Sequence, residues 1–272
     1  HHGDGVTADR IVTDGFVAAA FEHATSRAGD PQLHTHVVVA NLLHGADGRW
    51  SALDSRALYR HAKTAGYLYQ AALRTQLTER LGVAWLSPER GVAELSEHFN
   101  RVDALFSKRS AQVKDAMKAR GVSGGRAAQA ACLGTRPAKD RASSPAELRE
   151  GWAAEVRDIG VDPDELVAGH FVVRGAGPSR EFDRAKLGDR LLGPQGLTKH
   201  ATTFTRDDAL QAVAMKLPAG IGSVADLERY VDELLGSSAV IPVDSPSAGG
   251  ERRWTTQEHL DLERRAIATA GE

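Results

Sequence analysis

Three histidines fall close together in the stretch HATSRAGDPQLHTHVVVAN, which begins at His23. His34 and His36 stand two residues apart in a run that ends in β-branched residues, so a strand would direct both imidazoles to one face. Asp30 and Pro31 are typical turn residues, and they would let His23 lie on a neighbouring antiparallel strand. Three neutral imidazoles could bind one divalent transition metal ion and leave coordination positions open. The alternative is a set of unrelated surface or core histidines.

The elements that would position these histidines are an antiparallel sheet and a long helix. The stretches GFVAAAFEHATSR and LHTHVVVANLLH are apolar enough for strands. The pair Asp47 and Gly48 then favours a hairpin turn that leads into a short strand at WSALD. Ser55 should cap a helix over residues 56–80, because leucine and alanine recur there with helical spacing and Gly82 follows.

Most of the remaining sequence predicts helices. A helical pattern runs from about residue 92 to 120, and RAAQAACLGT and SPAELREGWAAEVRDIG predict two more helices, the second capped by Ser144. Residues 174–199 are rich in glycine, proline and mixed charge, which indicates a connecting region. Two capped amphipathic helices, a short strand at AVIPV and a last helix are expected after residue 200.

Composition restricts the class of protein. Hydrophobic residues make up 42% of the 272 residues and charged residues 26%, and no apolar run is long enough for a membrane helix, so we expect no membrane insertion. The single cysteine, Cys132, excludes an internal disulfide and a cysteine-based zinc site, which fits a cytoplasmic protein. The net charge is -2, yet residues 101–141 hold ten Lys and Arg against three acids.

The whole phrase around the histidines resembles the histidine motif of conjugative relaxases of the TrwC/TraI (MobF) family, which nick plasmid DNA at an origin of transfer. The resemblance continues through DGRWSALDSRALYRHAKTAGYLYQAALRTQL and, more weakly, through FSKRSAQVKDAMKARG and TRPAK, so it covers roughly residues 1–160. It implies that His23, His34 and His36 are the HUH-type triad, which holds one divalent cation (Mg, Mn or Zn) beneath the scissile phosphate.

The resemblance also implies a fold and partners. We expect an α+β chain in which an antiparallel palm sheet carries the metal and helical fingers close over single-stranded origin DNA, with other relaxosome proteins as further partners. The expected domains are a relaxase domain at residues 1–175, a linker at 176–199 and the start of a helicase-like region at 200–272. Two alternatives stay open: a fragment of a replication-type HUH endonuclease, and a non-catalytic remnant that binds single-stranded DNA.

In this family a tyrosine hydroxyl attacks the phosphorus and leaves a 5'-phosphotyrosyl bond. The nucleophilic tyrosines lie near the natural N-terminus, upstream of the histidine motif, whereas the tyrosines of this sequence all follow it, at Tyr59, Tyr67, Tyr69 and Tyr230. These four fit packing or DNA contact better than nucleophilic attack. We therefore expect the sequence to be a fragment without the catalytic tyrosine and inactive by itself.

Cations near the motif and in the basic stretch are candidates for phosphate contact. The predicted DNA-binding residues are Arg27, Arg60, Lys63, Lys108, Arg109 and Lys114. For most of them the alternative is a solvated face, and Arg27 could equally brace a strand end. Asp30 could orient a metal-bound imidazole or simply form the turn, and Asn41 could support the site or close the sheet edge. Trp50 is expected in the core.

Overall fold

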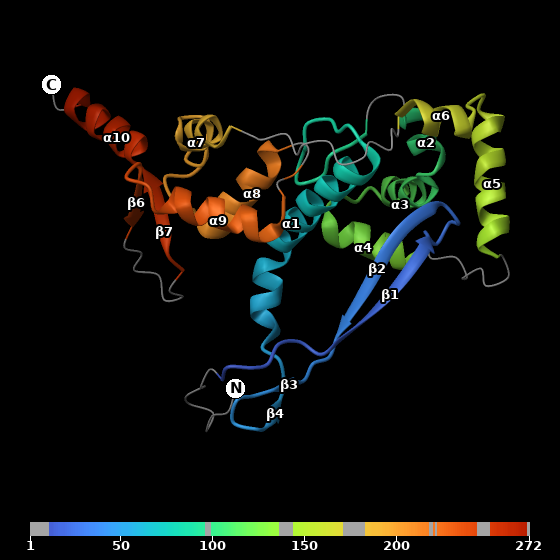
Figure 1. The fold of residues 1–272 in the computed structure, drawn as a ribbon, viewed down its shortest axis with the longest axis horizontal. Coiled ribbons are helices and arrows are strands. Elements are labelled where there is room, and N and C mark those ends of the chain that lie inside the picture. Colours follow the sequence, from blue (N-terminus) through green and yellow to red (C-terminus); the bar gives the residue numbers. More distant parts are fainter. Residues whose placement is uncertain are drawn as a thin grey trace. The chain divides into compact units, whose positions relative to one another are not determined.

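The computed structural model describes residues 11–95, 99–135, 144–170, 183–217, 220, 222–243 and 251–270, and it has the expected α+β class (Figure 1). The chain forms two compact units. The first unit comprises His1–Ser55 and Glu97–Val167, and the second comprises Arg56–Ser96 and Ala168–Glu272. Each unit is therefore built from two separate pieces of sequence.

Two hairpins form the strands of the first unit. Strand β1 (Ala18–Thr25) pairs with β2 (Pro31–Val39), and the much shorter β3 (Leu43–His44) pairs with β4 (Trp50–Ser51), both antiparallel. Gly48 in the second turn has a positive φ of 75°, which glycine adopts without strain. The strands and turns around the histidines therefore follow the sequence prediction.

Helices make up the rest of the first unit, in part differently from the prediction. The predicted helix over residues 92–120 is confirmed only in part, because Val92 and Leu95 form isolated bridges with Glu89 and Trp85 and the helical residues 100–119 are divided into two helices at residues 106 and 107. The predicted Ser144 cap is confirmed, with a capping box formed to Glu147. The helices are α2 (Asn100–Leu105), α3 (Lys108–Ala119), α4 (Gly125–Gly134), α5 (Pro145–Asp158) and α6 (Pro163–His170), the last of which ends past the unit boundary.

The second unit holds the best-packed core. Its elements are α1 (Ser55–Leu81), α7 (Arg184–Leu192), α8 (Arg206–Lys216), α9 (Val224–Leu235), α10 (Gln257–Ala270), and a sheet of order β5-β7-β6 from β5 (Phe204–Thr205), β6 (Val240–Val243) and β7 (Arg253–Thr256). Ala71 of α1 belongs to the same buried cluster as Val213 and Leu227 of α8 and α9. The side chain of Arg74, also buried, donates to the carbonyl oxygens of Ala214 (2.8 Å) and Leu217 (3.4 Å), and burial lowers its pKa.

The predicted domains are defined by resemblance to a protein family, whereas the two compact units are defined by packing. Helix α7 lies inside residues 176–199, so part of the expected linker is helical. The two compact units do not follow the chain order, since α1 packs with elements that come more than a hundred residues later. The division into a relaxase domain, a linker and a helicase-like region stays a prediction.

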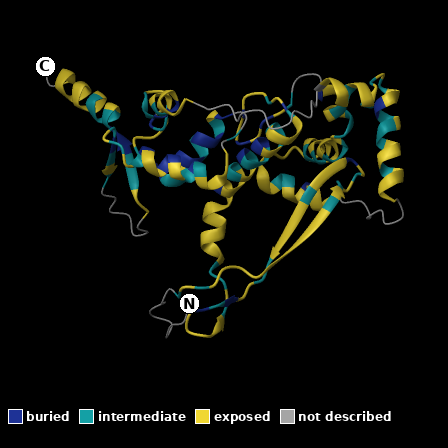
Figure 2. Ribbon diagram, viewed as in Figure 1, coloured by how far each residue is buried: buried dark blue, intermediate teal, exposed yellow. Residues whose placement is uncertain are grey.

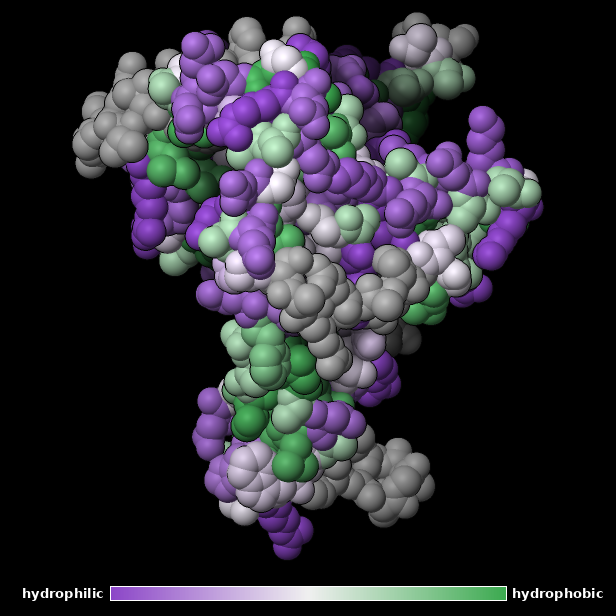
Figure 3. All heavy atoms as spheres, turned by 90° about the vertical axis from the view of Figure 1, so that its right-hand side faces the viewer, coloured by the Kyte–Doolittle hydropathy of each residue, from purple (hydrophilic) through white to green (hydrophobic). Residues whose placement is uncertain are grey.

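The first unit leaves much of its strand surface exposed. Figure 2 shows β1 and β2 mostly exposed, whereas α8 and α9 contain several buried positions. Hydrophobic side chains gather in the lower part of Figure 3, and the exposed large hydrophobic residues of the first unit include Val37, Val38 and Leu42. Trp50 is 55% exposed with its ring beside that of His44, so its expected core position is wrong. Among the described residues, no helix combines the length and apolar character needed to cross a bilayer.

Candidate metal centre

The register of β1 and β2 brings the three histidines together. His23 is paired directly with His34, and Phe21 is paired with His36. Cross-strand partners and residues two apart share a face of the sheet, so all three imidazoles project from the same side. The ladder is irregular between His23 and Thr25, where the strand enters the turn.

The three rings form a triangle. Their centroids lie 4.8 to 5.3 Å apart, and each pair of ring planes meets at 76° to 87°. One nitrogen from each ring falls within 4.8 Å of the other two, which is close enough for all three to bind one ion. His23 and His34 are half-buried and His36 is exposed, so a bound ion would stay accessible from solvent.

A backbone carbonyl orients one of these rings. Nδ1 of His34 lies 2.9 Å from the carbonyl oxygen of Gln32. Because a carbonyl can only accept, Nδ1 carries the proton, and Nε2 is the nitrogen left for a metal. Fixing the tautomer in this way is the usual support for a histidine ligand. The donor set of three imidazoles therefore fits a divalent transition metal ion.

Asp30 holds the turn that precedes the histidine strand. It is 2% exposed, and its carboxylate accepts hydrogen bonds from the Ser26 hydroxyl (3.2 Å) and the Arg109 backbone N–H (3.4 Å). Its other oxygen lies 3.8 Å from Nζ of Lys108. These contacts favour the turn-forming role and connect the turn to α3. Trp152 of α5 adds a hydrogen bond from its indole N–H to the carbonyl oxygen of Gly29 (2.8 Å).

The predicted DNA contacts in α3 have different surroundings. Lys108 forms ion pairs with Glu155 and Asp30, so its charge is already compensated. The Arg109 guanidinium donates to the carbonyl oxygens of Cys132 (2.5 Å) and Thr135 (2.9 Å). Lys114 is exposed and, within the described part of the chain, forms no ion pair.

The remaining predicted contacts lie on other elements. Arg27 is exposed in the turn between β1 and β2. Arg60 and Lys63 are exposed on α1 in the second unit, where the Lys63 ammonium lies over the ring of Tyr67, 5.6 Å from its centroid. The three cations are thus accessible, and Arg27 belongs to the first compact unit, whereas Arg60 and Lys63 belong to the second.

One family profile covers the part of the chain that contains the histidine triangle. The profile of the TrwC relaxase family matches residues 3–159, which contain the whole triangle and helices α2 to α5. The chain belongs to the TrwC relaxase family. The family resemblance expected from the sequence is therefore confirmed, together with its approximate extent.

The curated relatives are much longer than this member of the TrwC relaxase family. The multifunctional conjugation protein TraI of Escherichia coli is 27% identical over 268 residues, and that of strain K12 is 26% identical over 264 residues. Each alignment covers 87% of this chain and 14% of the relative, so the chain spans about one seventh of those proteins. Among solved structures, metal-free and metal-bound conjugative relaxase TrwC in complex with origin-of-transfer DNA are 32% and 31% identical. Both superpose with a TM-score of 0.49 and cover 54% of this chain. The match covers 53% of the metal-free TrwC chain and 52% of the metal-bound one.

The four tyrosines differ in their surroundings. Tyr230 is buried in the second unit, its hydroxyl donates to the carbonyl oxygen of Arg184 (2.9 Å), and burial raises its pKa. Tyr67 packs closely against Gly91, where an added Cβ would lie 2.8 Å from the ring. Tyr59 and Tyr69 are exposed on α1. The structural surroundings of Tyr67 and Tyr230 thus agree with the packing role expected from the sequence.

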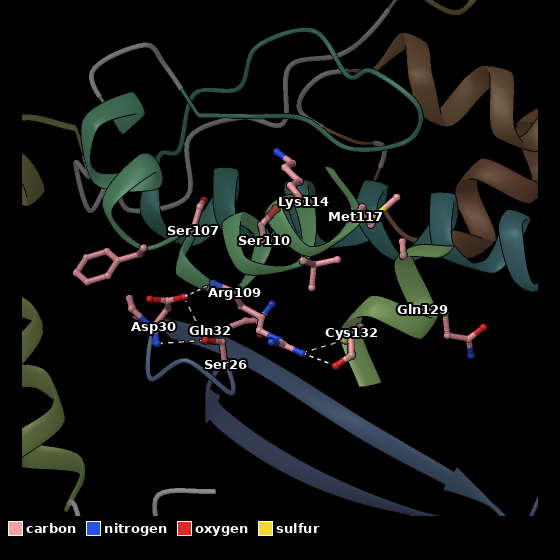
Figure 4. Close-up of a pocket in the computed structure, with 14 residues that line it drawn as sticks. Ser26, Asp30, Gln32, Ser107, Arg109, Ser110, Lys114, Met117, Gln129 and Cys132 are labelled. Atoms are coloured by element: carbon pink, nitrogen blue, oxygen red, sulfur yellow. Dashed lines mark hydrogen bonds between the residues drawn. The ribbon is translucent and has the colours of Figure 1, made fainter. Parts of the chain in front are cut away.

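A pocket next to the histidine strand was not predicted. It has a volume of about 700 Å³ and lies between the β1–β2 turn, α3 and α4 of the first unit (Figure 4). Gln32, whose carbonyl orients His34, is one of its lining residues. The pocket joins segments about a hundred residues apart, and the sequence contains no local pattern that indicates such a contact.

Proposed function

We propose that this chain is the metal-binding and DNA-binding part of a conjugative relaxase, which cuts one DNA strand at an origin of transfer by tyrosine transesterification. The triangle formed by His23, His34 and His36 is the observation that carries the proposal. Membership of the TrwC relaxase family and the likeness to TraI support it. The same family match argues against the replication-type endonuclease as an alternative.

His23, His34 and His36 would hold the metal ion. When bound, the ion would neutralise charge on a non-bridging oxygen of the scissile phosphate. Imidazole nitrogen suits zinc and similar transition ions, whereas magnesium prefers oxygen ligands, so we propose a transition metal ion. The Gln32 carbonyl keeps the His34 ring in the binding orientation.

The cations position the DNA strand in this proposal. Arg27, Arg60, Lys63, Arg109 and Lys114 would contact phosphates of single-stranded origin DNA, which in a conjugative system is a plasmid strand in the cytoplasm. Lys108 would act mainly through its ion pairs with Glu155 and Asp30, which keep α3 against the histidine turn. Other relaxosome proteins would be further partners.

The nucleophile is proposed to be a tyrosine that these 272 residues do not supply. Its hydroxyl oxygen would bond to phosphorus as the phosphorus–O3' bond breaks, and the phenol proton would end on the released 3'-oxygen. Because the alignment with TraI covers 87% of the chain and so extends past the family match, we also propose that residues 200–272 begin a helicase-like region.

Metal titration of the complete chain tests whether the three histidines bind a metal ion. Isothermal titration with Mn²⁺ or Zn²⁺ should give one site in the wild type and a far weaker one in His23→Ala and His36→Ala. The matched control is His44→Ala, since His44 lies in the same unit but pairs with Asp14 (2.9 Å) instead. Equal affinity in all four proteins would refute the metal centre, and with it the proposed relaxase chemistry.

A further inference from the structure

The hairpin that carries the histidines contains a β-bulge next to its turn. Thr25 is paired with Pro31. A regular antiparallel ladder that continued from this pair would place His34 opposite Glu22, on the other face of the sheet from His23. The observed partner of His34 is His23 instead, so the register shifts by one residue between the turn and the histidines. This shift is what brings the first two histidines to one face.

The bulge also concerns the acceptor that orients His34. Two residues of β2, Gln32 and Leu33, lie opposite the single residue Ala24 of β1. A bulge of this kind disrupts the ladder locally and changes the direction of side chains, and bulges are frequent beside functional sites. Here the carbonyl oxygen of Gln32 accepts the hydrogen bond from Nδ1 of His34 (2.9 Å). The bulged segment thus sets both the pairing and the orientation of this ring.

The turn beside the bulge is fastened to the start of α3. The residue before this helix, Ser107, makes no capping hydrogen bond with its side chain. Asp30 of the turn takes that role, because its carboxylate accepts a hydrogen bond from the backbone N–H of Arg109 (3.4 Å), in the first turn of α3 (Figure 4). The helix dipole favours a carboxylate at this end. The same carboxylate accepts from the Ser26 hydroxyl, so one buried group joins the turn to the helix.

Helix α5 holds the same turn through two side chains that lie one helical turn apart. The indole N–H of Trp152 donates to the carbonyl oxygen of Gly29 (2.8 Å), a contact that spans 123 residues. Glu155 forms an ion pair with Lys108 (2.5 Å), whose ammonium also lies 3.8 Å from Asp30. Because the Asp30 side chain is only 3% exposed, solvent screens its attraction to Lys108 little. The position of the turn therefore depends on α5 as well as on α3.

We propose that Trp152 and Glu155 of α5, together with Asp30, are positioning residues of the metal centre, which hold the bulged register in which His23 and His34 share a face. They act through the turn, and the ligands are the three histidines. The inference rests on the proposed function and adds to it a control of metal affinity by a helix distant in sequence.

Substitutions on α5 in the complete 272-residue chain test this control. Trp152→Phe removes the indole N–H, and Glu155→Gln removes the charge that pairs with Lys108. Each should bind Co²⁺ about tenfold more weakly than the wild type, as is typical for loss of a group that orients metal ligands, and should change the visible absorption of the bound ion. The matched control is Glu150→Gln, since Glu150 is exposed on the same helix and forms no ion pair within the described residues.

Two measurements on the metal-free chain separate positioning from stability. Urea unfolding gives the stability of each variant, which a merely structural role would lower without any change in metal affinity or spectrum. Nuclear magnetic resonance of protein labelled at histidine gives the contact between the ring protons of His23 and His34, whose ring centroids lie 5.3 Å apart. This contact should weaken in Trp152→Phe and Glu155→Gln, and it should persist in Glu150→Gln.

The outcomes distinguish this inference from the proposed function. Wild-type Co²⁺ affinity and spectrum in Trp152→Phe and Glu155→Gln would overturn the inference and leave the metal centre intact. An equal loss of affinity in Glu150→Gln would overturn it as well. If the wild-type chain binds no Co²⁺, the proposed metal centre is wrong, and the ring contact in the metal-free chain then decides whether α5 holds the register. A ring contact that is the same in all variants would show that it does not.

Discussion

His23 and His34 face each other as direct cross-strand partners, with ring centroids 5.3 Å apart. This pairing makes the histidine triangle a property of the hairpin register rather than of flexible side chains. His36 joins them because two residues along a strand return to the same face. The position of the turn, held by Asp30 and Trp152, therefore determines whether the three nitrogens can share an ion.

Removing one ligand should abolish tight metal binding. Loss of groups that only orient a ligand lowers metal affinity about 10- to 100-fold, so loss of a ligand itself in His36→Ala should cost at least about 100-fold. Calorimetric titration with Zn²⁺ measures this change, and His44→Ala should behave like the wild type. A His36→Ala protein that binds within a few-fold of wild type would contradict the triangle.

Protons should compete with the metal. The ligand nitrogens must be unprotonated, so the affinity should decrease as the pH falls. The same titration at about pH 7.5 and about pH 5.5 checks this direction. Affinity that is the same at both values would point to ligands other than histidine.

Charge reversal in α3 should weaken DNA binding. The triple variant of Lys108, Arg109 and Lys114 to glutamate should bind single-stranded DNA more weakly and with a shallower dependence on salt, because fewer counterions are released. Lys114→Glu alone should reproduce part of this loss without lowering stability, since Lys114 has no ion pair within the described residues. Anisotropy titrations over a range of salt concentrations measure the affinity for DNA and its dependence on salt. An unchanged salt slope in the triple variant would move the DNA surface elsewhere, such as to α1 with Arg60 and Lys63.

The chain alone should form no covalent adduct with origin DNA. A positioned nucleophile is required for phosphoryl transfer, and without one the covalent step should be lost almost entirely. A longer protein that includes the native upstream sequence should give a denaturant-resistant adduct on a gel. An adduct from the 272 residues that disappears in Tyr59→Phe, Tyr67→Phe or Tyr69→Phe would show that the nucleophile lies on α1.

The pair Arg206 and Asp232 should make a small, pH-dependent contribution to stability. Their hydrogen bond (2.7 Å) holds the pKa of the Asp232 carboxyl below its usual range. A lowered carboxyl pKa stabilises the folded state above the unfolded value near about 3.9, and this is lost as the pH falls through the folded pKa. Because both side chains are more than one-third exposed, Asp232→Asn should cost less than about 1 kcal/mol at neutral pH. Urea unfolding of the wild type and Asp232→Asn at neutral and at acidic pH measures this loss of unfolding free energy. An equal loss at the two pH values would show that the ion pair with Arg206 does not contribute to stability.

The sequence predicted the histidine hairpin because its signals are local. Alternation along a strand and the turn residues at Asp30 and Pro31 act over a few positions, and they suffice to bring His34 and His36 to one face. The contacts that anchor the hairpin were not predictable in this way. The ion pair between Lys108 and Glu155 spans 47 residues, and no residue pattern indicates it before α3 and α5 are folded.

Two errors of prediction have the same origin. The apolar spacing after residue 92 resembles that of a helix, but Val92 and Leu95 pair with Glu89 and Trp85 in isolated bridges, so the first helix begins only at Asn100. Trp50 is expected in the core, yet the short β3–β4 hairpin leaves it 55% exposed. In both cases tertiary surroundings, which a window of sequence does not contain, determined the outcome.

The strand period makes this metal centre unusually sensitive to the number of residues in the chain. Inserting one residue between Thr35 and His36 would turn His36 to the opposite face of β2, whereas inserting two would return it to the original side but one pair further from His34. The loop of residues 26–30 lies outside the β1 and β2 strands, but Asp30 is buried against α3 and Gly29 accepts a hydrogen bond from Trp152, so a change of length there would also shift the turn. Length variation among related genes should therefore be nearly absent between the first and third histidines.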